Sequence, residues 1–433
     1  MTSTARLPPI RLPDTGTDAA IVVALSGGLD STVLLHALAA MPVVRARGLR
    51  AVHVHHGLNA AADAWIADCE ALCAGLDVPL RVVRVVVDAR AGLGLEGAAR
   101  AARHAALADA LGEGELLALA HHRDDQAETF LLRALRASGP DGLGAMRALR
   151  PFANGWLWRP LLDAPRAALH AYAQSHALQW IDDPANAALE HDRNFLRHRV
   201  LPLLRERWPH ADDALARAAA LNAEAAALLA EDDARALHAA RTDDPQTLAL
   251  APLRELTAPR RARTLRRWIA ELDLPPLPAE GIARIEADLA GGAPDADFRF
   301  DWANAGIRRW RDRLHASPTL PAPHAGWSDT WDGRAPLVLP DGGVLELRGA
   351  PAFDAPVHVR PRAGGERIVL PGRAHSHTLK HALQDAGIPT WERERLPLLL
   401  DAEGTVLAAG DRVVSAALDA WLRTHAALLH WQA

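Results

Sequence analysis

Apolar runs alternate with helix-spaced segments along the first half of the chain. Four apolar runs have the length of buried strands: 21–25, 50–56, 80–88 and 116–122. The segments that follow them carry apolar residues at helical spacing: 31–40, 62–75, 96–111 and 124–137. Such alternation predicts a parallel sheet with helices on both faces. In open sheets of this kind, ligands bind beyond the carboxyl ends of the strands.

The pattern changes to nearly continuous helix formers from about residue 211. Two further helical stretches lie near 259–272 and 279–290, and residues 317–329 are rich in proline and glycine, as in a linker. We therefore predict a doubly wound α/β domain, an all-helical domain and a small α+β domain. The predicted parts are a flexible N-terminus (1–20), the α/β domain (21–212), the helical domain (213–316), the linker (317–330) and the α+β domain (331–433).

Composition narrows the class of protein. The chain has 433 residues, no apolar run approaching the ~20 residues of a spanning helix, and no apolar core of a signal peptide near its start. Its two cysteines, Cys69 and Cys73, exclude a disulfide framework and lie one helical turn apart, which favours two small buried residues over half of a metal site. We expect a cytoplasmic protein with no membrane contact.

Basic residues are unevenly distributed along the chain. A net charge of −5 argues by itself against a nucleic-acid partner, but the basic charge is almost all arginine, and Lys380 is the single lysine. Arginines gather in four segments: 193–208, 254–268, 308–313 and 360–367. Arginine suits bidentate phosphate contact, although each cluster alone is more typical of a solvated face.

The segment "SGGLDST" follows the first apolar run and precedes a helix. It resembles a phosphate loop, yet no lysine follows the glycines to reach a terminal phosphate. Gly27 and Gly28 allow close approach of an anion to the helix N-terminus, and Ser26 and Ser31 add hydroxyl donors. Asp30 would repel a bare phosphate, so it indicates Mg²⁺ between carboxylate and pyrophosphate. The alternative is a helix entry capped by Asp30 or Ser31.

A second polar group follows the apolar run 116–122. His121 and His122 end that run, and Asp124, Asp125 and Glu128 crowd the first turn of the next helix. A carboxylate pair beside a phosphate loop suits an amine substrate, because it holds the ammonium group and accepts a proton before attack. Helix capping and a metal cluster are the alternative interpretations.

These motifs identify a family resemblance. "SGGLDST" resembles the pyrophosphate loop of N-type ATP pyrophosphatases, which cleave ATP between the α and β phosphates. "VHVHHGL", "GLGLEGAARAARH", "AHHRDDQAETFLLRALRASGPDGLGAM" and "WIDDPANAALEHDRNFLRHRVLP" then follow in the order seen in the tRNA(Ile)-lysidine synthetase family. The segment 360–399 resembles that family's final domain. The family joins L-lysine to carbon 2 of the wobble cytidine in tRNA(Ile) with a CAU anticodon, which changes decoding from AUG to AUA and charging from methionine to isoleucine.

The resemblance implies roles for individual residues, with ATP and Mg²⁺ as cofactors. The residues implied for ATP and Mg²⁺ are Ser26, Gly27, Gly28, Leu29, Asp30, Ser31, His55 and Gly57. Those implied for lysine, cytidine and catalysis are Arg100, Arg103, His122, Asp125, Glu128, Arg193, Asn194 and Arg197. The expected tRNA contacts are Arg260, Arg261, Arg263, Arg267, Arg308, Arg309, Arg362, Arg367, Arg373 and Lys380. His375 and His377 either join them or alternate on a surface strand without function.

Three rival interpretations are weaker. A tRNA thiolase with the same loop usually needs several cysteines, an amide ligase of the GMP-synthetase type needs a glutaminase cysteine, and a catalytically dead RNA-binding module would not need the intact loop and carboxylate pair. The sequence leaves the oligomeric state open, with a homodimer as one option.

Overall fold

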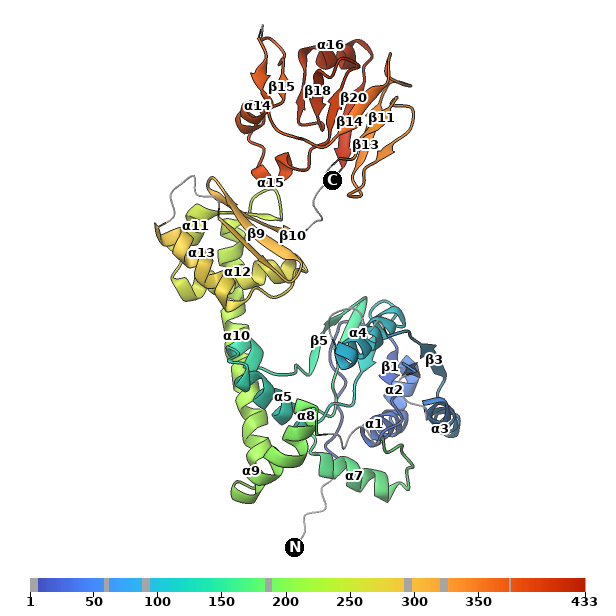
Figure 1. The fold of residues 1–433 in the computed structure, drawn as a ribbon. Coiled ribbons are helices and arrows are strands. Elements are labelled where there is room, and N and C mark those ends of the chain that lie inside the picture. The colour runs from blue at the N-terminus through green and yellow to red at the C-terminus, as the bar shows by residue number, and fades with distance from the viewer. Residues whose placement is uncertain are drawn as a thin grey trace. The chain divides into compact units, whose positions relative to one another are not determined.

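A computed structural model describes residues 7–57, 62–87, 94–183, 189–291, 298–319, 326–373 and 375–432 (Figure 1). The chain divides into two compact units, residues 1–231 and 232–433, and each is described by itself. Among the described residues, no helix is both long and apolar enough to cross a membrane.

The first unit is built on a six-stranded sheet with the order β3-β2-β1-β4-β6-β5. Its strands are β1 (Ile21–Ala24), β2 (Leu49–His55), β3 (Leu80–Arg84), β4 (Leu116–Ala118), β5 (Leu149–Phe152) and β6 (Gly155–Trp158). All neighbouring strands are parallel except the edge hairpin β5–β6. The predicted parallel sheet is confirmed, and the sequence interpretation omitted only the hairpin.

Helices cover both faces of this sheet, as predicted. The helices of this unit are α1 (Leu29–Ala39), α2 (Pro42–Arg47), α3 (Ala62–Gly75), α4 (Gly94–Asp109), α5 (Arg123–Leu135), α6 (Pro140–Leu143), α7 (Arg166–Ser175), α8 (Asp192–Phe195), the π-helix Leu196–Val200 and α9 (Leu201–Arg207). The alternation along β1 explains the two layers. Ile21 and Val23 pack with residues of α1, α3 and α7, whereas Val22 packs with Leu107 of α4 on the other face.

Part of the segment expected to be flexible, residues 1–20, lies against the first unit. Residues 1–6 lie outside the described part, and Leu7, Ile10 and Leu12 are partly buried against the core of the first unit. Burial of these three apolar side chains holds the segment on the first unit.

The helix α10 (Ala211–Ala240) runs from the first unit into the second. It is followed by α11 (Leu250–Glu255), α12 (Ala258–Glu271) and α13 (Ala279–Gly291), so the predicted helices are present. The region also contains an antiparallel sheet with the order β7-β10-β9-β8, and "all-helical" is therefore incomplete. Its strands are β7 (Thr247–Ala249), β8 (Arg299–Trp302), β9 (Ala305–Trp310) and β10 (Arg313–Pro318).

The C-terminal part has its own core of strands and short helices, in agreement with the predicted α+β class. Its sheets have the orders β11-β14-β17-β18-β19, β12-β13-β20 and β15-β16. The strands are β11 (Asp329–Trp331), β12 (Leu337–Val338), β13 (Val344–Arg348), β14 (Val357–Arg360), β15 (Arg367–Ile368), β16 (His377–Thr378), β17 (Leu398–Leu400), β18 (Val406–Ala409), β19 (Val413–Val414) and β20 (Leu428–Gln432). The helices are α14 (Leu379–Asp385), α15 (Thr390–Arg393) and α16 (Ala416–Thr424).

Candidate active site

The loop between β1 and α1 has the geometry of an anion cradle. Ser31 Oγ donates to the carbonyl of Gly28 at 3.0 Å and accepts from the backbone N–H of Ser26 at 3.2 Å. Gly28 is the N-cap of α1 and contributes no side chain there. The first N–H groups of an 11-residue helix, including that of Leu29, therefore have no intrahelical partner and carry the positive end of the helix dipole.

Gly27 is required for two reasons. Its φ of +83° is a left-handed conformation, and a Cβ there would lie 2.4 Å from Cδ1 of Ile181. The backbone N–H of Ile181 donates to the carbonyl of Gly27 at 2.9 Å. A side chain at position 27 would therefore strain the backbone and force the Ile181 side chain to move.

The second polar group begins at His122, which is completely buried and caps α5. His122 Nδ1 accepts from the N–H of Asp125 at 3.4 Å, and Asp125 Oδ2 accepts from the N–H of His122 at 3.0 Å. His122 Nε2 lies 3.6 Å from Asp30 Oδ2 and 3.4 Å from Asp125 Oδ2. One imidazole therefore connects the phosphate loop to the carboxylate pair.

Asp30 suits a cation. Its Oδ1 is buried and has no hydrogen-bond partner, so one carboxylate oxygen beside the anion cradle is unsatisfied. Within the described ranges, no three histidine, cysteine, aspartate or glutamate side chains form a metal-binding group. A Mg²⁺ ion at this position would need phosphate oxygens and water to complete its coordination, which is how Mg²⁺ is commonly held.

The two predicted amine-binding carboxylates are brought together with the arginines of the 193–197 segment. Arg197 Nε donates to Glu128 Oε1 at 2.7 Å, while its Nη2 donates to Asp125 Oδ1 at 2.9 Å and to Glu128 Oε2 at 3.1 Å. Arg193 Nε lies 3.2 Å from Glu128 Oε2, and its Nη2 donates to Thr129 Oγ1 at 2.8 Å. The Glu128 side chain has no exposed surface, whereas that of Asp125 keeps 11 %.

Burial and charge act differently on these groups. Burial raises the pKa of Glu128, with Arg197 opposing that rise. Burial also acts to raise the pKa of Asp125, but His122, His121 and Arg197 together bring it below its usual value. Burial opposes the charge of His122, yet the carboxylates of Asp30, Asp125 and Asp124 raise its pKa. Of the two carboxylates, Asp125 is the one whose pKa the site lowers.

The other predicted active-site residues surround this centre less closely. His55 is buried, and its Nε2 lies 3.5 Å from Asp63 on α3. Gly57, with a φ of +68°, is exposed just beyond β2. Arg100 and Arg103 are exposed on α4, and Asn194 is half-buried between Arg193 and Arg197. The charge of Arg100 reaches His121.

Both cysteines are structural. Cys69 and Cys73 are buried in the core, and burial raises the pKa of their thiols to about 12 and about 11. Thiols of this kind are poor nucleophiles and poor metal ligands at neutral pH. Their environment gives no support to thiolase chemistry.

Several arginines expected to contact tRNA are instead tied into ion pairs of the second unit. Arg309 is 3 % exposed and lies 3.2 Å from Asp288. Arg261 forms a bidentate pair with Glu286 at 2.8 and 2.6 Å. A phosphate contact is therefore not supported at these two positions, because their donors are already committed inside the fold.

The remaining predicted tRNA contacts range from half-buried to exposed. Arg263 pairs with Asp233, Arg267 pairs with Glu271, and Arg260 pairs with Asp232. Arg308 lies over the ring of Trp391, and Arg362 donates to the carbonyl of Arg393. Exposed basic side chains gather around β15 and β16: Arg367, Arg373 and Lys380. His377 belongs to β16, which pairs with β15, and His375 is exposed beside it.

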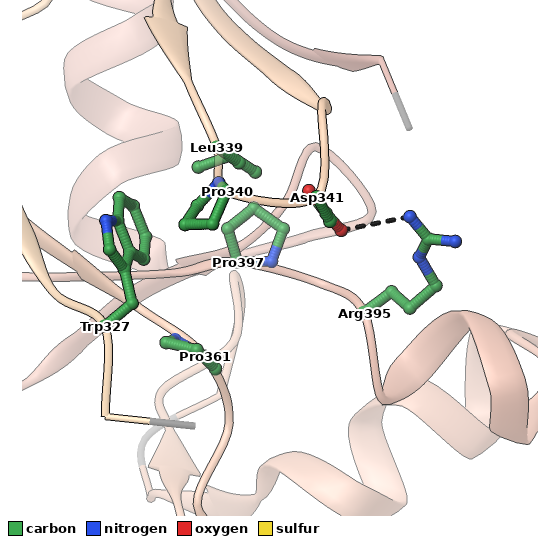
Figure 2. A pocket seen from close by; sticks show the side chains of 7 residues that line it. All are labelled: Trp327, Leu339, Pro340, Asp341, Pro361, Arg395 and Pro397. Atoms are coloured by element: carbon green, nitrogen blue, oxygen red, sulfur yellow. Dashed lines mark hydrogen bonds and ion pairs between the residues drawn. The ribbon is translucent and has the colours of Figure 1, made fainter. Parts of the chain in front are cut away.

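The C-terminal part also has a small apolar recess (Figure 2). Trp327, Pro361 and Pro397 form part of its wall, and Arg395 donates to Asp341 at 3.0 Å beside it. This ion pair ties the turn before β13 to the segment before β17. The sequence interpretation did not include it.

Two arginines near this site, Arg150 and Arg159, were not predicted from the sequence. Arg159 follows β6 directly and donates to His121 Nδ1 at 3.1 Å, and Arg150 lies on β5. The segment "GWLWR" could have predicted them, because an apolar run that ends in arginine indicates a further strand end at this edge of the sheet.

Comparisons with known proteins agree with this architecture. Three family descriptions match: a PP-loop domain over residues 9–204, a TilS substrate binding domain over 248–315 and a TilS substrate C-terminal domain over 357–431. The chain is 58% identical over 416 residues to the tRNA(Ile)-lysidine synthase of Xanthomonas campestris pv. campestris strain 8004, with 96% of this chain and 95% of the relative covered. The tRNA(Ile)-lysidine synthase of Xylella fastidiosa strain Temecula1 is 52% identical, with 98% and 97% covered. That of Serratia proteamaculans strain 568 is 44% identical, with 90% of each covered.

Proposed function

Because this chain belongs to the tRNA(Ile)-lysidine synthase family, we propose that it activates the wobble cytidine of tRNA(Ile) with ATP and then joins lysine to it. The observation that carries this mechanism is the link from the phosphate loop to the carboxylate pair. His122 lies 3.6 Å from Asp30 and 3.4 Å from Asp125, so the two halves of the reaction share one edge of the sheet.

In the first step, the oxygen on carbon 2 of the cytidine attacks the α-phosphorus of ATP, and pyrophosphate leaves. The loop N–H groups and the hydroxyls of Ser26 and Ser31 would bind the departing pyrophosphate. Mg²⁺, when bound at Asp30, would neutralise phosphate charge. His122 would keep the Asp30 carboxylate in place beside the loop.

In the second step, the ε-amine of lysine attacks carbon 2, the carbon–oxygen bond breaks and AMP leaves. The attacking amine must be neutral, so its ammonium form first gives up a proton, which the carboxylate that contacts it would accept. We assign the contact with lysine to Asp125, because its carboxylate is ionised and partly exposed. Glu128 is sealed behind Arg193 and Arg197, and it would act by holding those arginines.

An incoming lysine therefore meets a carboxylate that already accepts from Arg197 at 2.9 Å. Asp125 Oδ2 faces His122 rather than Arg197, which leaves the two oxygens in different roles. The lysine amine would bind an Asp125 carboxylate that already has a partner, the Arg197 guanidinium. The C-terminal cluster Arg367, Arg373 and Lys380 would hold a more distant part of the tRNA.

The test is incubation of the full chain with ATP, radiolabelled lysine and transcripts of tRNA(Ile) and tRNA(Met). We expect label only in tRNA(Ile) with the CAU anticodon. Asp125→Asn should lose transfer of label, and Asp68→Asn, an exposed aspartate on α3, is the matched control. Label on neither tRNA with the unaltered chain, or full transfer by Asp125→Asn, would contradict the proposal.

A further inference from the structure

A group of arginines lies at the carboxyl ends of β4 and β6, beyond the site described above. Arg159 follows β6, and the parallel pairing of Ala118 with Trp158 sets it beside the residues that follow β4. Its Nε donates to His121 Nδ1 at 3.1 Å, and its Nη1 donates to the carbonyl of Arg147 at 2.7 Å. Two of the three nitrogens are thus fixed by neutral groups.

Arg150 lies on the neighbouring strand and is also held without a carboxylate. Its guanidinium lies 5.4 Å from the ring centroid of Phe152, which in turn meets His104 edge-on at 4.9 Å. Its Nη1 donates to the carbonyl of Pro151 at 3.1 Å. Over the described residues, no carboxylate forms an ion pair with Arg150, Arg159 or Arg100.

These charges affect one another. Burial, and then the charges of Arg150, Arg100 and Arg133, lower the pKa of Arg159 to about 10. Burial also lowers the pKa of His121 to about 3, so its ring is neutral at physiological pH. Because His121 Nδ1 accepts from Arg159, the ring proton is on Nε2 and provides one more donor. Clustered cations without counter-ions are unfavourable in the free protein and become favourable when an anion binds.

We propose that Arg150 and Arg159, with Arg100 and His121 beside them, bind a backbone phosphate of the tRNA next to the wobble cytidine. This rests on the proposed function, which supplies the RNA. Phosphate is the shared chemistry of RNA and ATP, and the position in the sheet favours RNA. β4 separates β6 from β1, so this group lies ~10 Å along the sheet edge from the pyrophosphate loop. The segment beyond β2, which the family resemblance assigns to the nucleotide, lies on the opposite side of β1.

The experiment measures binding of a tRNA(Ile) transcript across a salt series, with the full chain carrying Arg150→Gln, Arg159→Gln or both. Arg81→Gln, an exposed arginine on β3, is the control for loss of one charge. Each single variant should weaken binding roughly tenfold at low salt. Each should also reduce the slope of log K against log salt by about one, since one phosphate contact is lost. Affinities for ATP and lysine should not change.

Unchanged slopes in both variants would overturn the proposal. An unchanged slope with weaker ATP binding would also overturn it, because the anion would then be an ATP phosphate. Arg159→Gln also removes the bond to His121, so Arg150→Gln, which contacts Pro151 and Phe152 of its own hairpin, keeps the test independent of that change. Lysidine formation by the unaltered chain, measured in parallel, separates a failure of this site from a failure of the proposed function.

Discussion

Replacement of Arg197 by methionine tests whether the Arg197–Glu128 pair stabilises the first unit. Methionine keeps much of the apolar stem and removes the bonds of 2.7 and 3.1 Å to Glu128 and 2.9 Å to Asp125. Loss of one partner from a buried ion pair costs ~3–5 kcal/mol, because the other charge remains buried. Arg193 still lies 3.2 Å from Glu128, so we expect a loss of ~2–3 kcal/mol in the free energy of unfolding.

Urea unfolding followed by circular dichroism measures this loss in the transition of the first unit. The double variant Glu128→Gln with Arg197→Met should recover ~1–2 kcal/mol relative to the sum of the single losses, because the buried charge is then absent. The loss in Arg197→Met should also shrink as the pH falls, since burial already raises the pKa of Glu128 and protonation relieves the unpaired charge. A loss below ~0.5 kcal/mol, additive single losses, or a pH-independent loss would refute this reasoning.

Three further predictions concern the same site. Asp30→Ala should abolish formation of the adenylated tRNA while tRNA binding persists, because the unsatisfied Oδ1 for Mg²⁺ is lost; trapping of intermediate with labelled ATP measures this, and normal adenylation would contradict it. The Asp125→Asn variant should adenylate tRNA yet transfer lysine at least ~100-fold more slowly. An unchanged rate of lysine transfer under single-turnover conditions would contradict the assignment of the lysine contact to Asp125. In the folded protein His121 stays neutral down to its pKa of about 3, whereas in the unfolded chain the ring takes up a proton near pH 6.5. The folded protein therefore binds fewer protons than the unfolded chain between these pH values. Its stability falls as the pH is lowered through that range. His121→Gln should therefore flatten the slope of unfolding free energy against pH below 6.5, by up to ~1.4 kcal/mol per pH unit, and an identical slope in both proteins would show that His121 does not titrate in this way.

Much of the first unit was predictable from local pattern. Apolar runs ending at Gly-Gly or His-His mark strand ends, and their alternation with helices defines a parallel sheet whose functional residues meet at one edge. The loop chemistry was predictable for the same reason, since Gly27, Gly28 and Ser31 act through backbone conformation and near neighbours. The strands β7, β8, β9 and β10 were not predicted because they are short, and β8, β9 and β10 carry arginines that are typical of a basic surface.

The arginines show where sequence reasoning ends. Arg308 and Arg309 are adjacent in β9, and the period of two sends them to opposite faces. One lies over Trp391 and the other is buried against Asp288. The sequence does not distinguish these two arginines. Only the packing of the sheet shows that Arg308 contacts a tryptophan ring and that Arg309 forms a buried ion pair.

The family, the phosphate loop and the carboxylate pair were predictable from the sequence, because each motif consists of residues within a few positions of one another. Only the tertiary structure shows that Arg197 pairs with Glu128 and Asp125, some seventy residues earlier in the chain, and that Arg159 donates to His121 from the neighbouring strand. Such pairings depend on how distant elements pack, and local periodicity carries no information about the partner that a long side chain will meet.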